Sequence, residues 1–225
     1  TLNQTQGKEN NAMNKRNRIP KAIWIIALLA TIASPTWANQ TKGIPVGGEM
    51  PPFSLKDTTG AKHALGDLKG KVAVLIFTSQ ECPWSRGADP GLNALAKKYK
   101  AKGVAFLGIN SHRDTKPDAI SDYAKANEVT YPILKDRANR YADKVNARVT
   151  PEIFVVDKKG RVVYHGAFDD RKGPNDTGAT NYLANALDSV LAGKAVSQPE
   201  VKAWGCGIKR VKKKAAGGYG GSGSK

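Results

Sequence analysis

The sequence predicts an α/β fold in which a mainly parallel sheet is closed by an antiparallel hairpin. Two short apolar runs rich in β-branched residues, 72–77 and 104–109, have the composition of buried parallel strands, and a helical pattern follows each of them. Further along, the runs 153–157 and 161–165 flank a Lys-Lys-Gly turn, which is typical of a β-hairpin. Alternation of strands and helices favours a parallel core, and the hairpin adds antiparallel strands to it.

The remaining elements follow from local patterns. Phe53 and Leu55 alternate with polar residues and Gly60 supplies a turn, so we expect a β-hairpin before the first buried strand. Pro90 is expected to kink or restart the helix that follows this strand. The other predicted elements are a helix that starts at 115–118, a short extended piece at 130–134, and helices over 137–145 and 177–191.

Composition divides the 225 residues into four segments. We expect an upstream remnant at 1–12, a secretory signal peptide at 13–38, one domain at 39–208 and a flexible, basic, Gly-rich tail at 209–225. The apolar part of the signal has about a dozen residues, whereas a membrane-spanning helix needs about 20. Cleavage after Ala38 would therefore leave an exported protein without a membrane anchor, in the periplasm or outside the cell, where disulfides persist.

Charge and residue usage exclude several partners. The net charge is +17, of which residues 1–38 contribute +4 and residues 207–225 contribute +6, which leaves +7 for the domain. This moderate excess predicts no nucleic-acid partner. Two cysteines exclude a disulfide-rich scaffold and a Cys-only zinc site, and the three histidines lack ligand spacing. We expect neither a metal nor another cofactor, and the sequence leaves the oligomeric state open.

Cys82 is the strongest candidate for a chemical role. It follows the first buried strand and precedes Pro83, which suits the first turn of a helix because its missing N–H costs nothing there. A thiol at a helix start can have its pKa lowered to roughly 3.5–7.5. The polar run 78–81 favours an exposed thiol, and the Ser85 hydroxyl, on the same helical face, can donate to a thiolate. The alternative is an inert cysteine packed beside a helix start.

Several motifs resemble one protein family. Cys82-Pro83-Trp84-Ser85 resembles the active-site turn of thioredoxin-fold proteins, and Thr150-Pro151 resembles their cis-proline loop. The segments 48–53, 70–72, 157–160, 164–170 and 205–209 resemble the redoxin branch, the peroxiredoxin-like alkyl hydroperoxide reductase and thiol-specific antioxidant group. The resemblance covers residues 44–210. It implies a thioredoxin-like fold, with a central mixed sheet flanked by helices and an N-terminal β-hairpin extension.

The resemblance also implies roles for the motif residues. Cys82 would be the nucleophile with Ser85 beside it, and a cis bond at Pro151 would expose the Thr150 backbone to a substrate chain. A proline that only shapes the start of a strand is the alternative. For Trp84 the choice is between contact with a partner and simple half-burial. The hydroxyls of Thr78 and Ser79 are further candidates for substrate contact.

The chain departs from the motifs of both dithiol thioredoxins and peroxiredoxins. Ser85 stands where a dithiol thioredoxin has its second cysteine, and Leu75 and Ser79 replace the usual proline and threonine of peroxiredoxins, although Ser79 keeps a hydroxyl. Cys206, as the only other thiol, would either resolve an oxidised Cys82 or form a structural disulfide with it.

Three functions therefore stay open. The first is an exported thiol-disulfide oxidoreductase that acts on protein or small-molecule thiols and disulfides. The second is a thiol peroxidase that reduces hydroperoxides. The third is a non-catalytic thioredoxin-like module, held together by a Cys82–Cys206 disulfide.

Overall fold

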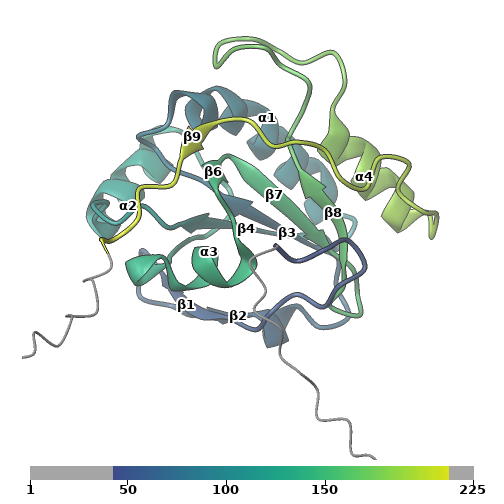
Figure 1. The fold of residues 1–225 in the computed structure, drawn as a ribbon, viewed down its shortest axis with the longest axis horizontal. Coiled ribbons are helices and arrows are strands. Elements are labelled where there is room, and N and C mark those ends of the chain that lie inside the picture. The colour runs from purple at the N-terminus through teal and green to yellow at the C-terminus, as the bar shows by residue number, and fades with distance from the viewer. Residues whose placement is uncertain (1–42, 213–225) are drawn as a thin grey trace, which may run out of the picture. The chain divides into compact units, whose positions relative to one another are not determined.

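The protein is described by a computed structural model that covers residues 43–212. The predicted remnant 1–12, the predicted signal peptide 13–38 and the last part of the tail lie outside the described residues. A seven-stranded mixed sheet, in the order β2-β1-β5-β4-β3-β7-β8, forms the centre (Figure 1). Its strands are β1 (Ser54–Asp57), β2 (Lys62–Ala64), β3 (Ala73–Phe77), β4 (Ala105–Asn110), β5 (Ile133–Lys135), β7 (Glu152–Val156) and β8 (Val162–Gly166).

Strand directions agree with the sequence prediction. The strands β3, β4 and β5 are parallel to one another, while β7 and β8 form the predicted antiparallel hairpin beside β3. The predicted N-terminal hairpin is also present, because β1 pairs antiparallel with β2 and then with β5. A separate two-stranded sheet joins β6 (Val149–Thr150) to β9 (Cys206–Gly207), two segments far apart in the sequence.

Helices cover both faces of the sheet. The α-helices are α1 (Pro83–Lys100), α2 (Pro117–Ala126), α3 (Arg140–Val145) and α4 (Tyr182–Leu191), and short 3₁₀ helices are η1 (Leu65–Leu68) and η2 (Arg137–Asn139). Side chains alternate along β3, so Val74 and Ile76 pack against α1 and α4, whereas Leu75 and Phe77 face α3 and the N-terminal segment. Within residues 43–212, no helix combines the length and the apolar character that crossing a membrane requires.

Pro90 neither ends nor restarts its helix. The helix α1 runs without a break from Pro83 to Lys100 with Pro90 in its interior. Pro90 lies on the exposed side of the helix, where water can bond to the Arg86 carbonyl that loses its helical partner. The predicted restart is therefore wrong, because the remaining helical bonds and the buried face hold the helix together.

Two other predicted helices begin later than expected. The segment 137–145 is divided into η2 and α3 by left-handed backbone at Ala138 (φ 58°) and Asn139 (φ 57°). Asn139 bonds through its side chain to the Ser111 carbonyl, and this tertiary contact outweighs the local helical pattern. The last helix begins at Tyr182 rather than at 177, because the Asn181 side chain accepts a hydrogen bond from the Ala184 N–H and caps it.

Candidate active site

The turn between β3 and α1 fixes Cys82 at the start of the helix, as predicted. Cys82 is the N-cap of α1 and Pro83 is its first residue. The Cys82 N–H donates to the Ser79 carbonyl (3.0 Å), and the Ser79 hydroxyl accepts from the Glu81 N–H (3.2 Å). The polar run nevertheless does not expose the thiol, since only 1 % of Cys82 is accessible to solvent. The prediction of an exposed thiol is wrong because other segments cover the turn.

The first covering segment is the loop between β6 and β7. The Thr150–Pro151 peptide bond is cis, and the Cys82 thiol donates a hydrogen bond to the Thr150 carbonyl at 2.9 Å. The prediction that Pro151 is cis and close to Cys82 is thus confirmed. Thr150 is fully buried at this position, so its backbone forms one wall of the thiol site.

The second covering segment carries the other cysteine. Strand β9 pairs antiparallel with β6 so that Cys206 lies opposite Thr150. Both cysteines are free thiols, and the half-buried Cys206 lies close enough to Cys82 for each side chain to change the pKa of the other. The two thiols of the chain therefore lie side by side, although they are distant in the sequence.

The surroundings of the two sulfurs give them different acidities. Burial by itself raises the pKa of Cys82, but interactions with the side chains of Cys206 and Thr150 and with the backbone N–H groups of Ser85 and Cys206 outweigh it and hold this pKa below its ordinary value. Burial and the bond to Cys82 raise the pKa of Cys206 to about 11. The thiolate of the pair therefore resides on Cys82, which is the better nucleophile.

Thr78, Ser79 and Ser85, whose hydroxyls the sequence suggested for the site, shape the turn instead of lining an open surface. Ser85 is buried and its hydroxyl accepts a hydrogen bond from the Ser79 N–H (3.4 Å). Thr78 and Ser79 are also buried, which argues against their predicted contact with a substrate. Their burial follows from the parallel sheet, because the Thr78 N–H continues the pairing with β4 by donating to the Ile109 carbonyl (3.0 Å).

Trp84 lies at the rim of the site and packs against Trp204, with the two rings tilted by 39°. Its ring is 5.1 Å from that of Trp204, and the Trp204 indole N–H donates to the Asp169 carbonyl (2.8 Å). The guanidinium of Arg171 lies 5.1 Å from the Trp204 ring and forms a buried ion pair with Asp169 (2.8 Å). Asp169 falls within the 164–170 motif, so that motif was the available signal for this cluster.

Residues 199–211, called the C-terminal strap here, hold Cys206 in place. In Figure 1 the strap is the yellow chain that leaves the α4 side, passes β9 and descends beside α2. Past Cys206, the Lys209 ammonium bonds to the Glu81 carboxylate (2.7 Å), and the Arg210 guanidinium pairs with Asp143. The strap is held as far as Val211, whose N–H donates to the Asn139 side-chain oxygen (2.8 Å).

His112 lies under the strap and is buried. It is 2 % exposed, and its Nδ1 accepts a hydrogen bond from the Lys209 N–H (3.3 Å). Burial lowers the pKa of His112, so the ring is predominantly neutral at pH 7. Its contact with the strap gives it a structural role.

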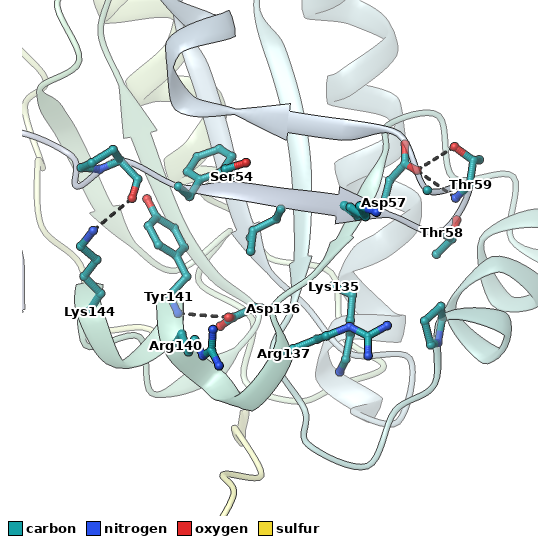
Figure 2. A pocket seen from close by; sticks show the side chains of 16 residues that line it. Ser54, Asp57, Thr58, Thr59, Lys135, Asp136, Arg137, Arg140, Tyr141 and Lys144 are labelled. Atoms are coloured by element: carbon teal, nitrogen blue, oxygen red, sulfur yellow. Dashed lines mark hydrogen bonds between the residues drawn. The ribbon is translucent and has the colours of Figure 1, made fainter.

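A basic pocket of about 680 Å³ lies away from the thiols, between β1 and the β5–α3 segment (Figure 2). Its carboxylates are already bonded, since Asp57 accepts from Thr59 and Asp136 accepts from the Tyr141 N–H. Lys135 donates to Asn110 (3.2 Å), and the Asn110 amide donates to Gln80 (3.0 Å), which links the pocket to the turn before Cys82. The cationic side chains of the pocket are Lys56, Lys135, Arg137, Arg140 and Lys144.

A low-pKa thiol at a helix start, facing a cis-proline on a mixed sheet, defines a thioredoxin-like redox protein. The described residues 43–212 contain no cluster of His, Cys, Asp and Glu that could hold a metal ion. The low pKa of Cys82 beside a second thiol makes exchange at sulfur the chemistry that the site offers.

The chain belongs to the AhpC/TSA family, whose model matches residues 46–165. It is 29 % identical over 154 residues to the thiol-disulfide oxidoreductase ResA of Bacillus cereus, an alignment that covers 66 % of this chain and 87 % of the relative. It is 32 % identical over 126 residues to the thioredoxin-like protein YneN of Bacillus subtilis, with 56 % and 73 % covered.

The structure is also similar to a solved one. A hypothetical protein from Sinorhizobium meliloti superimposes with a TM-score of 0.72 at 30 % identity, over 76 % of this chain and 98 % of that one. The predicted thioredoxin-like fold and redoxin family are thus confirmed, and the protein is an oxidoreductase.

Proposed function

We propose that the protein is an exported thiol-disulfide oxidoreductase whose redox centre is the pair Cys82 and Cys206. The observation that supports this proposal most strongly is that Cys206 lies opposite Thr150, whose carbonyl accepts a hydrogen bond from the Cys82 thiol, so that the two thiols adjoin. Their interaction lowers the pKa of Cys82 and raises that of Cys206. A nucleophile and a second thiol within reach of it are the two parts that a complete exchange cycle requires.

The first step is attack on an external disulfide. The Cys82 thiolate forms a bond to one substrate sulfur, the substrate S–S bond breaks, and the other sulfur leaves as a thiolate. The N–H groups at the start of α1 stabilise the negative charge of Cys82 before the attack. The product of this step is a mixed disulfide between Cys82 and the substrate.

The second step is resolution by Cys206. Once Cys82 is in a mixed disulfide, its negative charge is gone, and with it one cause of the raised pKa of Cys206. Cys206 then loses its proton to the leaving thiolate and attacks the Cys82 sulfur, which expels the second substrate thiol. The substrate gains two electrons, the chain holds a Cys82–Cys206 disulfide, and an external dithiol reduces that disulfide to restart the cycle.

Ser85 cannot perform this resolution, because a hydroxyl does not form a disulfide. Its position instead supports the first step, in which its N–H faces the reacting sulfur. Thr150 and Trp84 complete the site as a backbone wall and an aromatic rim. Export is part of the proposal on the evidence of the signal-like residues 13–38, and a periplasmic or extracellular location would allow the disulfide to persist.

Mass spectrometry of two variants tests the proposal. After exposure to an oxidised dithiol, Cys206→Ser should accumulate mixed disulfides on Cys82, because the resolving thiol is missing. Cys82→Ser should abolish exchange altogether. Unchanged turnover and no adducts in Cys206→Ser would show that another thiol resolves Cys82.

Two further measurements separate the alternatives. Consumption of hydrogen peroxide at a rate that exceeds disulfide exchange would favour a thiol peroxidase instead. A disulfide that forms between Cys82 and Cys206 but never transfers electrons to or from an external dithiol would favour a structural module.

A further inference from the structure

The strand edge of the cis-proline loop, at β6, is already paired with another segment of the same chain, β9. A polypeptide substrate commonly binds by adding its backbone to an unpaired strand edge. Beside Cys82 that edge is β6, and β9 pairs with it so that Cys206 lies opposite Thr150. The Cys206 sulfur thus takes the place beside Cys82 that the sulfur of a bound substrate strand would take.

The fit of this segment depends on a glycine. Gly205 has a φ of +140°, and a Cβ at this position would lie 2.0 Å from the Thr150 carbonyl oxygen. Because the obstacle is backbone, no side-chain rotation could relieve it. The neighbouring Gly207 differs, because its Cβ would meet nothing within 4 Å. Close approach of the strap to Thr150 therefore requires glycine at 205 and not at 207.

Hydrogen bonds and side-chain contacts hold the strap in place on both sides of Cys206. Before the cysteine, the Val201 N–H donates to the His165 carbonyl (3.0 Å) and Trp204 packs against Trp84. After it, the Ile208 N–H donates to the Arg148 carbonyl (2.9 Å) and Lys209 pairs with Glu81. With the strap in this position Cys82 is 1 % exposed, and the edge of β6 beside it is paired with β9.

We infer that residues 204–208 act as an internal substitute for a substrate strand, so that the docked strap excludes extended polypeptides from Cys82. The inference rests on the proposed exchange at Cys82. A low-molecular-weight disulfide needs only a shift of the Cys206 side chain, whereas a polypeptide must first displace β9 from β6. The protein as folded is therefore selective for small disulfides, and polypeptide disulfides react after the strap has been released.

The test compares two substrates that release the same aromatic thiol. One is an extended peptide whose cysteine is linked to that thiol, and the other is a single blocked cysteine linked to it. Release of the thiol is measured in a Cys206→Ser background, so that the reaction stops at the mixed disulfide. Gly205→Ala should raise the ratio of the peptide rate to the small-substrate rate by about tenfold, since backbone pairing no longer has to be broken.

Gly207→Ala is the matched control and should leave the ratio unchanged. Hydrogen exchange at the Ile208 amide reports whether Gly205→Ala releases the strap, and unchanged protection there would contradict the inference. A constant ratio despite lost protection would also overturn it. If Gly205→Ala does not fold, Lys209→Ala combined with Arg210→Ala removes the two ion pairs instead, with Lys212→Ala as its charge control.

The outcome is distinguishable from failure of the proposed function. If Cys82 reacts with neither substrate in any variant, the proposed exchange at Cys82 is wrong. If the small substrate reacts normally and only the predicted change in ratio is missing, the exchange stands and the role of the strap is wrong.

Discussion

The acidity of Cys82 is set by two opposing effects at one sulfur atom. Burial disfavours the thiolate, whereas four surrounding donors favour it, and the Cys206 thiol is the largest contributor among these donors. A cysteine with the same burial but without the donors would be inert. The reactivity of Cys82 therefore depends on a residue from the other end of the domain.

Removing that donor should shift the pH profile of Cys82. In the wild-type protein, the alkylation rate plotted against pH should have its midpoint at lower pH for Cys82 than for Cys206, whose pKa is about 11. In Cys206→Ala the midpoint of Cys82 should move to higher pH, because burial is retained while the largest stabiliser of the thiolate is lost. The measurement is the alkylation rate against pH, followed by peptide mapping.

Cys206→Ser serves as the control, because its hydroxyl can still donate to the sulfur. Its midpoint for Cys82 should lie between those of the wild type and Cys206→Ala. A faster reaction at Cys206 than at Cys82 in the wild type would show that the nucleophile has been misassigned.

Among single residues, the sequence predicted those whose role is visible in the residues directly next to them. Cys82 was found because a strand, a cysteine and a proline follow one another, and Pro151 because it begins a strand. A partnership of Cys82 with Cys206 was expected only because Cys206 is the other thiol, and no local pattern indicated how the strap crosses the sheet to bring it there. The same path covers the turn, and the polar run 78–81 gave no signal of that cover.

Helix α1 carries the nucleophile at its start and is crossed by a loop one turn later. A Cβ at Gly87 would lie 1.7 Å from the Pro174 carbonyl oxygen, so the backbones of helix and loop touch there. Glycine inside a helix costs about 1 kcal/mol relative to alanine. The structure accepts this cost because the loop that contains Asp169 and Arg171 packs close to the helix.

Gly87→Ala should consequently destabilise the protein despite its better helix propensity. The added methyl group must push the loop away from α1, at an expected net cost of about 1–3 kcal/mol. Chemical denaturation measures the change. Gly66→Ala is the matched control, since a Cβ at Gly66 meets nothing within 4 Å. A Gly87→Ala protein that is as stable as the wild type would show that the loop adjusts freely.

Elements with strong periodicity were predicted well, and elements set by tertiary hydrogen bonds were not. The buried strands and the closing hairpin follow from apolar composition, which the sheet requires. The division between η2 and α3 arises from the bond between Asn139 and Ser111, which no local pattern encodes. The start of α4 at Tyr182 depends on a cap at Asn181 that competes with an equally helical sequence before it.

Across the whole molecule, the Cys82–Cys206 pair joins the beginning of α1 to the strap and thus encloses most of the sheet. Oxidation would close a loop that contains β4, β5, β7 and β8. In the chain-entropy model, closing a loop of this size stabilises the folded state by about 4–5 kcal/mol. The redox state of the pair should therefore change global stability as well as reactivity.

Thermal unfolding of the oxidised and reduced protein tests this expectation. The oxidised form should melt higher by roughly 8–20 °C, as a domain of this size gains about 2–4 °C per kcal/mol. Cys82→Ser and Cys206→Ser should both melt at one temperature whatever the redox state. Equal melting temperatures for the oxidised and reduced wild type would indicate that the pair does not form an intramolecular disulfide.

The order of Cys82 and Cys206 along the chain also has a consequence for biosynthesis. The ribosome makes β3 and the start of α1 well before β9, so for a time the growing chain holds Cys82 without the strap that covers it. During that interval the Cys82 thiol is not covered by the strap, and Cys206, which lowers its pKa, has not yet been made. Among the strands of residues 43–212, β9 is made last, and its arrival covers Cys82 and places Cys206 beside it. A chain that stops before residue 206 would therefore leave the Cys82 thiol uncovered.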